Sequence, residues 1–202
     1  AGQALAFELV LAGHRAMFAT ADVSQKAQVE AAVATVKSQL GPVDVLFNHA
    51  GTIVIKPFLE TEEEDWDFLF DVNVKSMYLM TRAVLPMMVE AGKGSIVCTS
   101  SISAVYATPM EVLYDATKGA CHMFARAIAV EFRDKGIRCN AVCPGFIETH
   151  SHWDGGVWWN PNVEPLPAYG ATKGGILAMT KAMAPTTSKP VAKAQLRSAG
   201  IK

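Results

Sequence analysis

Residues 113–120 read Leu-Tyr-Asp-Ala-Thr-Lys-Gly-Ala and place Tyr114 four positions before Lys118. If this stretch is helical, the two side chains lie on one face, one turn apart. A lysine ammonium in that position favours the phenolate and so lowers the pKa of the tyrosine hydroxyl. Ser101 precedes the tyrosine by thirteen residues, and its hydroxyl can hold a substrate oxygen beside the phenol. Because the Tyr-x-x-x-Lys spacing is common in amphipathic helices, its meaning depends on the surrounding sequence.

The flanking sequence predicts a β-strand, a helix and a second β-strand. Residues 94–101 form a short apolar run that ends in hydroxyl side chains, which is typical of a buried parallel strand. Residues 120–132 carry apolar side chains at helical spacing, and residues 136–143 indicate another strand, which Pro144 and Gly145 end. Strand, helix and strand with short connections make a βαβ unit, whose functional residues collect at the carboxyl ends of the strands.

Another strand and a long helix are predicted upstream. Residues 43–47 form a compact apolar strand that runs into Asn-His-Ala-Gly at residues 48–51, a turn whose small residues let the backbone approach a ligand. Residues 62–84 predict a long helix with Thr61 as its N-cap and acidic side chains in its first turn. Asn73 lies inside this helix, and we expect it to mark a local kink because its side chain competes for backbone hydrogen bonds.

In this order and spacing, the motifs resemble the short-chain dehydrogenase/reductase family over about residues 13–149. The resemblance implies an α/β fold, with a Rossmann-like, doubly wound parallel sheet between two layers of helices. It also implies an oxidoreductase that transfers a hydride between a nicotinamide cofactor, NAD or NADP, and a small-molecule alcohol or ketone. The tyrosine of the family's catalytic set is the acid/base, and that set falls here on Asn73, Ser101, Tyr114 and Lys118.

The resemblance further implies which residues contact the cofactor. Asp22 and Val23 match the family's adenine-contacting pair, and Ile147 and Thr149 match positions that hold the nicotinamide carboxamide. The lysine binds the ribose hydroxyls in this family, and the asparagine holds a water that relays protons. The cofactor-binding set implied in this way is Asp22, Val23, Asn48, Ala50, Gly51, Tyr114, Lys118, Pro144, Gly145, Ile147 and Thr149.

The N-terminal sequence departs from the family pattern. The family begins with a strand and a Thr-Gly-x-x-x-Gly-x-Gly loop that binds the cofactor pyrophosphate, and this sequence contains neither. Residues 1–13 predict a helix, which matches either the second crossover helix of the family or the tail of its first helix. Residues 16–21 are expected to form a strand without a neighbour, because the family's first strand lies in the middle of the sheet.

Two interpretations of this departure remain open. We expect the chain to be an incomplete copy of a longer enzyme, because a complete chain of this sequence requires a rearranged fold. The alternative to an active oxidoreductase is a non-catalytic remnant that keeps the catalytic residues but does not bind cofactor productively. The missing phosphate loop favours the remnant, and the intact set of four catalytic positions favours the enzyme.

A second departure divides the chain into a partial dinucleotide-binding and catalytic core, residues 1–150, and an atypical segment, residues 151–202. In that segment Tyr169 and Lys173 repeat the Tyr-x-x-x-Lys spacing. Gly156, rather than serine, stands thirteen positions before this second tyrosine, so we expect the first pair to carry the chemistry.

Composition narrows the class of protein. The 202 residues are 50% hydrophobic with a formal net charge of −1, which suits one α/β domain with a sizeable core. No basic run indicates nucleic acid, and no apolar stretch reaches the roughly eighteen residues that span a bilayer. The four cysteines have no metal-binding or redox spacing, so we expect them to be buried free thiols and expect no metal site. Free thiols are typical of a reducing compartment, so we also expect a cytoplasmic location. The resemblance implies a homodimer or homotetramer.

Overall fold

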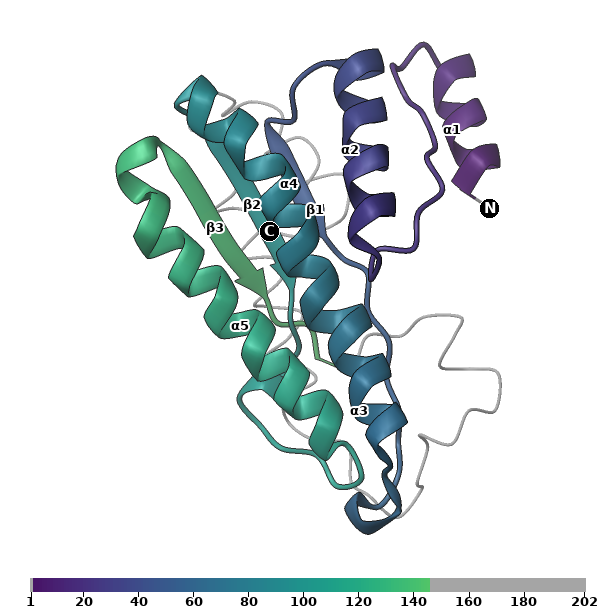
Figure 1. Ribbon diagram of the computed structural model, residues 1–202, viewed down its shortest axis with the longest axis vertical. Helices are drawn as coiled ribbons and strands as arrows, with labels where there is room; N and C mark the ends of the chain where they lie inside the picture. The colour runs from purple at the N-terminus through teal and green to yellow at the C-terminus, as the bar shows by residue number, and fades with distance from the viewer. Residues whose placement is uncertain (1, 146–202) are drawn as a thin grey trace, which may run out of the picture. The chain divides into compact units, whose positions relative to one another are not determined.

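A computed structural model of the chain describes residues 2–145 (Figure 1). Its helices are α1 (Gly2–Leu11), α2 (Lys26–Leu40), α3 (Glu63–Phe70), α4 (Ser76–Ala91) and α5 (Val112–Phe132). Its strands are β1 (Val45–Asn48), β2 (Gly94–Thr99) and β3 (Ile137–Val142). Short 3-10 turns occur at Phe58–Glu60, Ile102–Ala104 and Arg133–Lys135, and a π-helical turn occurs at Asp71–Lys75. No helix in this part of the chain is both long and apolar enough to cross a membrane.

The three strands form a parallel sheet in the order β1-β2-β3. Leu46 of β1 stands opposite Ile96 of β2, which stands opposite Cys139 of β3. Helices α4 and α5 make the two crossovers and pack on one face of the sheet (Figure 1). Two consecutive βαβ units are therefore present, which confirms the predicted parallel α/β class.

The two faces of the sheet differ in exposure. Leu46 and Cys139 point toward the helices and are buried, whereas Val45 and Phe47, on the other face of β1, are 64% and 58% exposed. This alternation follows from the two-residue period of a strand that is covered on one side. Residues 2–145 thus supply one helical layer, and the second layer of the predicted three-layer arrangement is not found among them.

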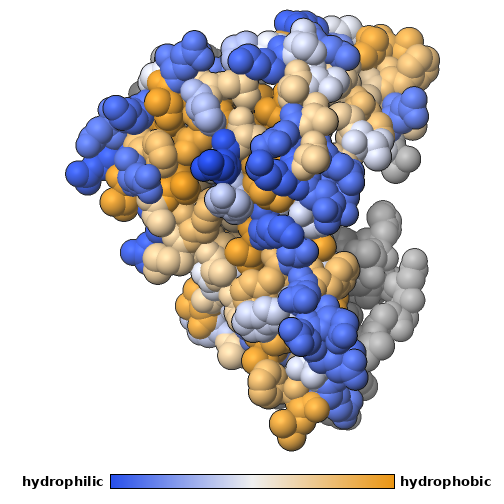
Figure 2. Space-filling view, viewed as in Figure 1, coloured by the Kyte–Doolittle hydropathy of each residue, from blue (hydrophilic) through white to orange (hydrophobic). Residues whose placement is uncertain are grey.

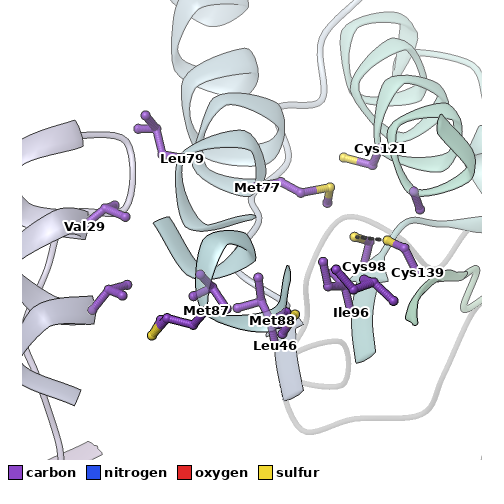
Figure 3. Close-up of a cluster of buried hydrophobic side chains, with 14 residues drawn as sticks. Val29, Leu46, Met77, Leu79, Met87, Met88, Ile96, Cys98, Cys121 and Cys139 are labelled. Atoms are coloured by element: carbon purple, nitrogen blue, oxygen red, sulfur yellow. Dashed lines mark hydrogen bonds between the residues drawn. The ribbon is translucent and has the colours of Figure 1, made fainter. Parts of the chain in front are cut away.

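The core lies between this helical layer and the sheet (Figure 3). Met88 of α4 and Ile96 of β2 are both 0% exposed, and Val29 brings α2 into the same cluster. Burial of such side chains stabilises the fold by about 1.5–3 kcal/mol each. The prediction of buried cysteines is confirmed for Cys98, Cys121 and Cys139, which are all buried and free, whereas Cys143 is only half-buried.

Helix α3 begins one residue later than predicted. Glu62 is its N-cap and forms a capping box with Asp65, whose Oδ2 accepts from the Glu62 backbone N–H at 3.1 Å. The predicted N-cap, Thr61, instead donates its hydroxyl hydrogen bond to the carbonyl oxygen of Phe58 at 2.8 Å. The prediction of Thr61 was therefore wrong, because the preceding 3-10 turn takes up its hydroxyl group.

The single helix predicted over residues 62–84 is two helices joined by the π turn Asp71–Lys75. Asn73 lies in the middle of this turn, which confirms the predicted irregularity at that residue. Helix α4 then continues through Pro86 to Ala91, where Gly92 ends it in the left-handed conformation.

Residues 16–21 do not form the predicted strand. They are irregular and join α1 to α2, because no strand among residues 2–145 is placed to pair with them. Helix α1 has no buried residue, and an apolar patch lies over it at the upper right of Figure 2. On this helix, Phe7 and Leu11 are 64% and 72% exposed.

Candidate active site

Helix α5 places the tyrosine and the lysine as predicted, one turn apart. The Lys118 side chain is buried, and its Nζ lies 5.5 Å from the centroid of the Tyr114 ring. Nζ donates one hydrogen bond, to the carbonyl oxygen of Thr99 at the end of β2, at 3.2 Å. An ammonium carries three N–H donors, so two have no partner in the described part of the chain.

The end of β2 brings the serine to the same place. Ser101 lies two residues after the end of the strand, has an extended backbone and is 7% exposed. Its Oγ accepts from the backbone N–H of Ser103 at 3.1 Å and lies beside the Tyr114 phenol, where hydrogen bonding lowers the phenol pKa. Ser100 donates to the carbonyl oxygen of Lys118 at 2.8 Å and thereby fastens the strand end to α5.

The electrostatics of the tyrosine differ from the prediction. Burial raises the pKa of Tyr114, and the negative charges of nearby Glu111, Cys121 and Asp115 act in the same direction. We predicted that Lys118 lowers this pKa, but in residues 2–145 the group that does so is Ser101. The ammonium lies over the ring, bonds the Thr99 carbonyl and is itself desolvated, so its own pKa falls below the usual lysine range.

Asn73 ties three segments together at the π turn. Its Oδ1 accepts from the Thr52 backbone N–H at 2.7 Å, and its Nδ2 donates to the Thr52 carbonyl oxygen at 2.9 Å. The same nitrogen donates to Thr117 Oγ1 at 3.0 Å, next to Lys118 on α5. Its backbone carbonyl oxygen accepts from Cys121 Sγ at 3.3 Å. Asn73 thus holds the turn after β1 against the helix that carries the tyrosine and lysine.

Gly51 lies next to the side chains of Asn73 and Lys118. A methyl group at this position would lie 3.3 Å from both Asn73 Oδ1 and Lys118 Nζ. These two polar atoms therefore flank the same space, and the absence of a side chain keeps that space open. The structure brings together Gly51, Asn73 and Lys118 in this way, with Tyr114 and Ser101 on the adjacent side.

The upstream cofactor candidates separate into two groups. Val23, Asn48 and Ala50 line a hollow of about 80 Å³ beside the start of α4. Asp22 is not among the residues that line this hollow. Its Oδ1 accepts from the Ser24 hydroxyl at 2.7 Å and from the Ser24 backbone N–H at 2.9 Å. Asn48 is buried, and its Nδ2 donates to Thr81 Oγ1 at 3.0 Å, so its amide is a structural link between β1 and α4.

The remaining predicted residues follow β3 in the chain. Pro144 and Gly145 follow β3 in the chain, and both are half-buried. Ile147 and Thr149 lie outside the described residues, as do the second tyrosine–lysine pair, Tyr169 and Lys173, and the predicted boundary at residue 150. Within residues 2–145, no group of three or more histidine, cysteine or acidic side chains is arranged to hold a metal ion.

Three residues at the site were not singled out from the sequence. Thr52 and Thr117 anchor the Asn73 amide, and Glu111 is buried one turn before Tyr114. The sequence offered one signal for Glu111: it is acidic and stands three positions before Tyr114, at the start of a predicted helix. Its burial depends on tertiary packing, which the local pattern does not report.

A parallel βαβ sheet with a tyrosine–lysine pair beside its strand ends defines a Rossmann-like α/β protein. The family model of short chain dehydrogenases matches residues 1–155. The chain belongs to this family.

Individual relatives agree with this membership. Oxidoreductase UcpA from Salmonella typhimurium is 42% identical over 146 residues, which are 72% of this chain and 56% of the relative. Cyclopentanol dehydrogenase from Comamonas sp. is 40% identical over 137 residues, 68% of this chain and 55% of the relative. The chain thus spans little more than half the length of these curated relatives.

A solved structure shows the same fold. The crystal structure of a gluconate 5-dehydrogenase from Burkholderia cenocepacia, in complex with NADP and tartrate, is 33% identical with a TM-score of 0.70. The match covers 73% of this chain and 58% of that one. The match therefore covers a similar share of the chain to that found for the curated relatives.

Proposed function

We propose that this chain carries the catalytic part of an NAD(P)-dependent dehydrogenase that interconverts an alcohol and a ketone. Tyr114 is the acid/base, Ser101 holds the substrate oxygen, and Lys118 and Asn73 support the proton transfer. The observation that carries this proposal is the convergence of Lys118 Nζ and Asn73 Oδ1 over Gly51, with the Tyr114 ring 5.5 Å from the same nitrogen.

The residues present fit a nicotinamide cofactor. Lys118 has two N–H donors without a partner among residues 2–145, which suits the two adjacent hydroxyl groups of a ribose. Gly51 has no side chain beside these donors, and Val23 and Ala50 line a hollow of about 80 Å³ where the family likeness places the adenine ring. When bound, the cofactor supplies or accepts the hydride. The NADP in the Burkholderia structure supports this class of cofactor for the family fold, without deciding between NAD and NADP.

The chain's own groups then move the proton. In reduction the Tyr114 hydroxyl donates its proton to the substrate oxygen, and in oxidation the phenolate takes it back. Ser101 Oγ holds the substrate oxygen beside the phenol, since it already lies next to that group. Both amide N–H groups of Asn73 are committed to Thr52 and Thr117, so Oδ1, which also accepts from the Thr52 backbone N–H, is the side-chain atom that would hold a relay water near Lys118.

Other parts of the assignment rest on the family likeness. Pro144, Gly145, Ile147 and Thr149 are proposed to complete the nicotinamide side, and Asp22 and Asn48 to support the adenine side. A homodimer or homotetramer and a cytoplasmic location also remain predictions. Met123 and Val130 on the outer face of α5 are 57% and 68% exposed, which suits an oligomer that packs through this helix.

Replacement of the tyrosine tests the proposed chemistry. We expect Tyr114→Phe to lower turnover of simple secondary alcohols, beginning with cyclopentanol, by roughly a hundred- to ten-thousandfold, because a positioned acid/base contributes about that much. The assay follows formation of reduced nicotinamide by its absorbance. Tyr78→Phe is the matched control, since Tyr78 lies on α4 and is 47% exposed. Turnover by Tyr114→Phe close to that of the wild type would exclude the assignment.

A further inference from the structure

A thiol and an imidazole from different elements meet where α5 packs on the end of β3. Cys143 Sγ lies 3.5 Å from His122 Nδ1, which is within hydrogen-bond reach for sulfur. His122 stands on α5, one turn after Lys118, and Cys143 is the first residue after β3. Both side chains are half-buried. Neither residue belongs to the proposed catalytic set.

The register of β3 explains why the thiol faces the helix. Side chains alternate along a strand, and Cys139 and Ala141 both pack on the helical side of the sheet. Cys143 follows Ala141 by two residues and therefore continues on the same side. The backbone just before it is held in place, because the Val142 carbonyl oxygen accepts from the Ser100 N–H at 2.7 Å. Two packed elements thus bring the sulfur and the imidazole together.

The other three cysteines of the chain are placed differently. Cys98, Cys121 and Cys139 are buried, and the sulfur atoms of Cys98 and Cys139 lie 3.9 Å apart in the core (Figure 3). Cys121 donates to the Asn73 carbonyl oxygen, and burial raises the pKa of its thiol to about 11. Of the four, Cys143 is the one that combines partial exposure with an imidazole as its hydrogen-bond partner.

The contact with His122 gives the Cys143 thiol a proton acceptor. The thiolate is the form of cysteine that attacks electrophiles, and a side-chain base within hydrogen-bond reach is the arrangement that generates it. A neutral imidazole has one ring nitrogen without a proton, so Nδ1 can accept the thiol proton when Nε2 carries the ring hydrogen. Since Cys143 is only half-buried, a small reagent can reach its sulfur.

We propose that Cys143 is a modification site for small-molecule disulfides, with His122 as the group that takes the thiol proton. The sulfur of Cys143 forms a bond with one sulfur of the reagent, and the S–S bond of the reagent breaks. The leaving sulfur departs with the electron pair of that bond and takes the proton from His122. The products are a mixed disulfide on the chain and one free small-molecule thiol, so no further oxidant is needed. This site does not depend on the proposed dehydrogenase chemistry.

The kinetics of labelling by dithiodipyridine test the proposal on the full chain. The absorbance of the released pyridinethione gives the rate, and peptide mass spectrometry identifies the modified cysteine. In the folded wild type we expect Cys143 to be the one fast thiol. We expect His122→Asn to slow it by about tenfold or more, because an amide can bond the sulfur but cannot accept its proton.

His14→Asn is the matched control, since His14 is exposed after α1, and it should leave the rate unchanged. Fast labelling of a different cysteine, or an unchanged rate in a folded His122→Asn variant, would overturn the proposal.

The wild-type chain alone decides the matter if His122→Asn does not fold. Unfolding in urea exposes Cys143 fully but separates it from His122. A thiol that is merely half-buried therefore reacts faster in urea, whereas a thiol that His122 activates reacts faster in the folded chain. Each rate is divided by that of N-acetylcysteine at the same urea concentration. We expect the higher corrected rate for Cys143 in the folded chain, and an equal or lower rate there would overturn the proposal.

Discussion

Replacement of Asn73 by alanine tests how the site is held together. The Asn73 side chain is 1% exposed, and its three hydrogen bonds join the turn after β1, the π turn and α5. Asn73→Ala removes these bonds and leaves the Thr52 N–H, the Thr52 carbonyl oxygen and the Thr117 hydroxyl with one partner fewer. Thr117 is 0% exposed, so water cannot replace the lost partner there without local opening.

The expected cost follows from these contacts. A buried hydrogen bond contributes about 1 kcal/mol net, and an unsatisfied buried group costs about 1–3 kcal/mol. Thr52 is only half-buried and Thr117 keeps its bond to the Tyr114 carbonyl oxygen at 2.8 Å, so the costs do not all apply in full. We expect Asn73→Ala to lower the free energy of unfolding by about 2–4 kcal/mol, which is a fall in Tm of roughly 5–15 °C.

Urea denaturation followed by circular dichroism measures this loss. Asn140→Ala is the matched control, because Asn140 is exposed on β3, and we expect it to change stability by less than about 0.5 kcal/mol. A loss below about 1 kcal/mol in Asn73→Ala would refute the reasoning, since the three bonds would then contribute almost nothing.

Two further predictions concern stability. Gly136→Ala should destabilise the fold by more than about 2 kcal/mol in urea unfolding, because Gly136 has φ +73° and a methyl group there would lie 2.1 Å from the Gly92 carbonyl oxygen. Gly119→Ala, whose methyl group meets nothing within 4 Å, is its control and should not destabilise. Stability should also depend on pH through Glu111. Its carboxyl binds a proton more tightly in the folded chain, so the free energy of unfolding should fall by about 3 kcal/mol as pH rises from about 4.5 past about 7. Glu111→Gln should remove this fall, and a wild-type profile that is flat or rises over this range would contradict it.

The strands and the helix that depend on local hydrophobic patterns were predicted correctly from the sequence. The apolar runs of β1, β2 and β3 and the periodic helix α5 placed Ser101, Tyr114 and Lys118 correctly at one end of the sheet. The helical irregularity at Asn73 was predicted correctly, but the expected competition for local backbone bonds is not seen, because its amide bonds Thr52 and Thr117 instead.

The errors came from properties that depend on distant contacts. Residues 16–21 have the composition of a strand, but a strand needs a neighbour to bond its backbone, and none is present among residues 2–145. The effect of Lys118 on the pKa of Tyr114 was predicted from spacing alone, whereas in the structure burial raises this pKa most strongly and the hydrogen bond with Ser101 is the next largest influence. Burial is decided by packing between elements, so the raised phenol pKa could not be predicted from local sequence.

A fluorescence titration of the 202-residue chain with NADH and, separately, NADPH tests the central claim most directly. Energy transfer from the chain's tryptophans to the reduced nicotinamide reports binding. We predict saturable binding of at least one dinucleotide, weakened about tenfold or more in Lys118→Met, because that variant loses the charged donors that we propose bind the ribose. A wild-type chain that is folded by circular dichroism and binds neither dinucleotide would contradict the proposed function and favour a non-catalytic remnant.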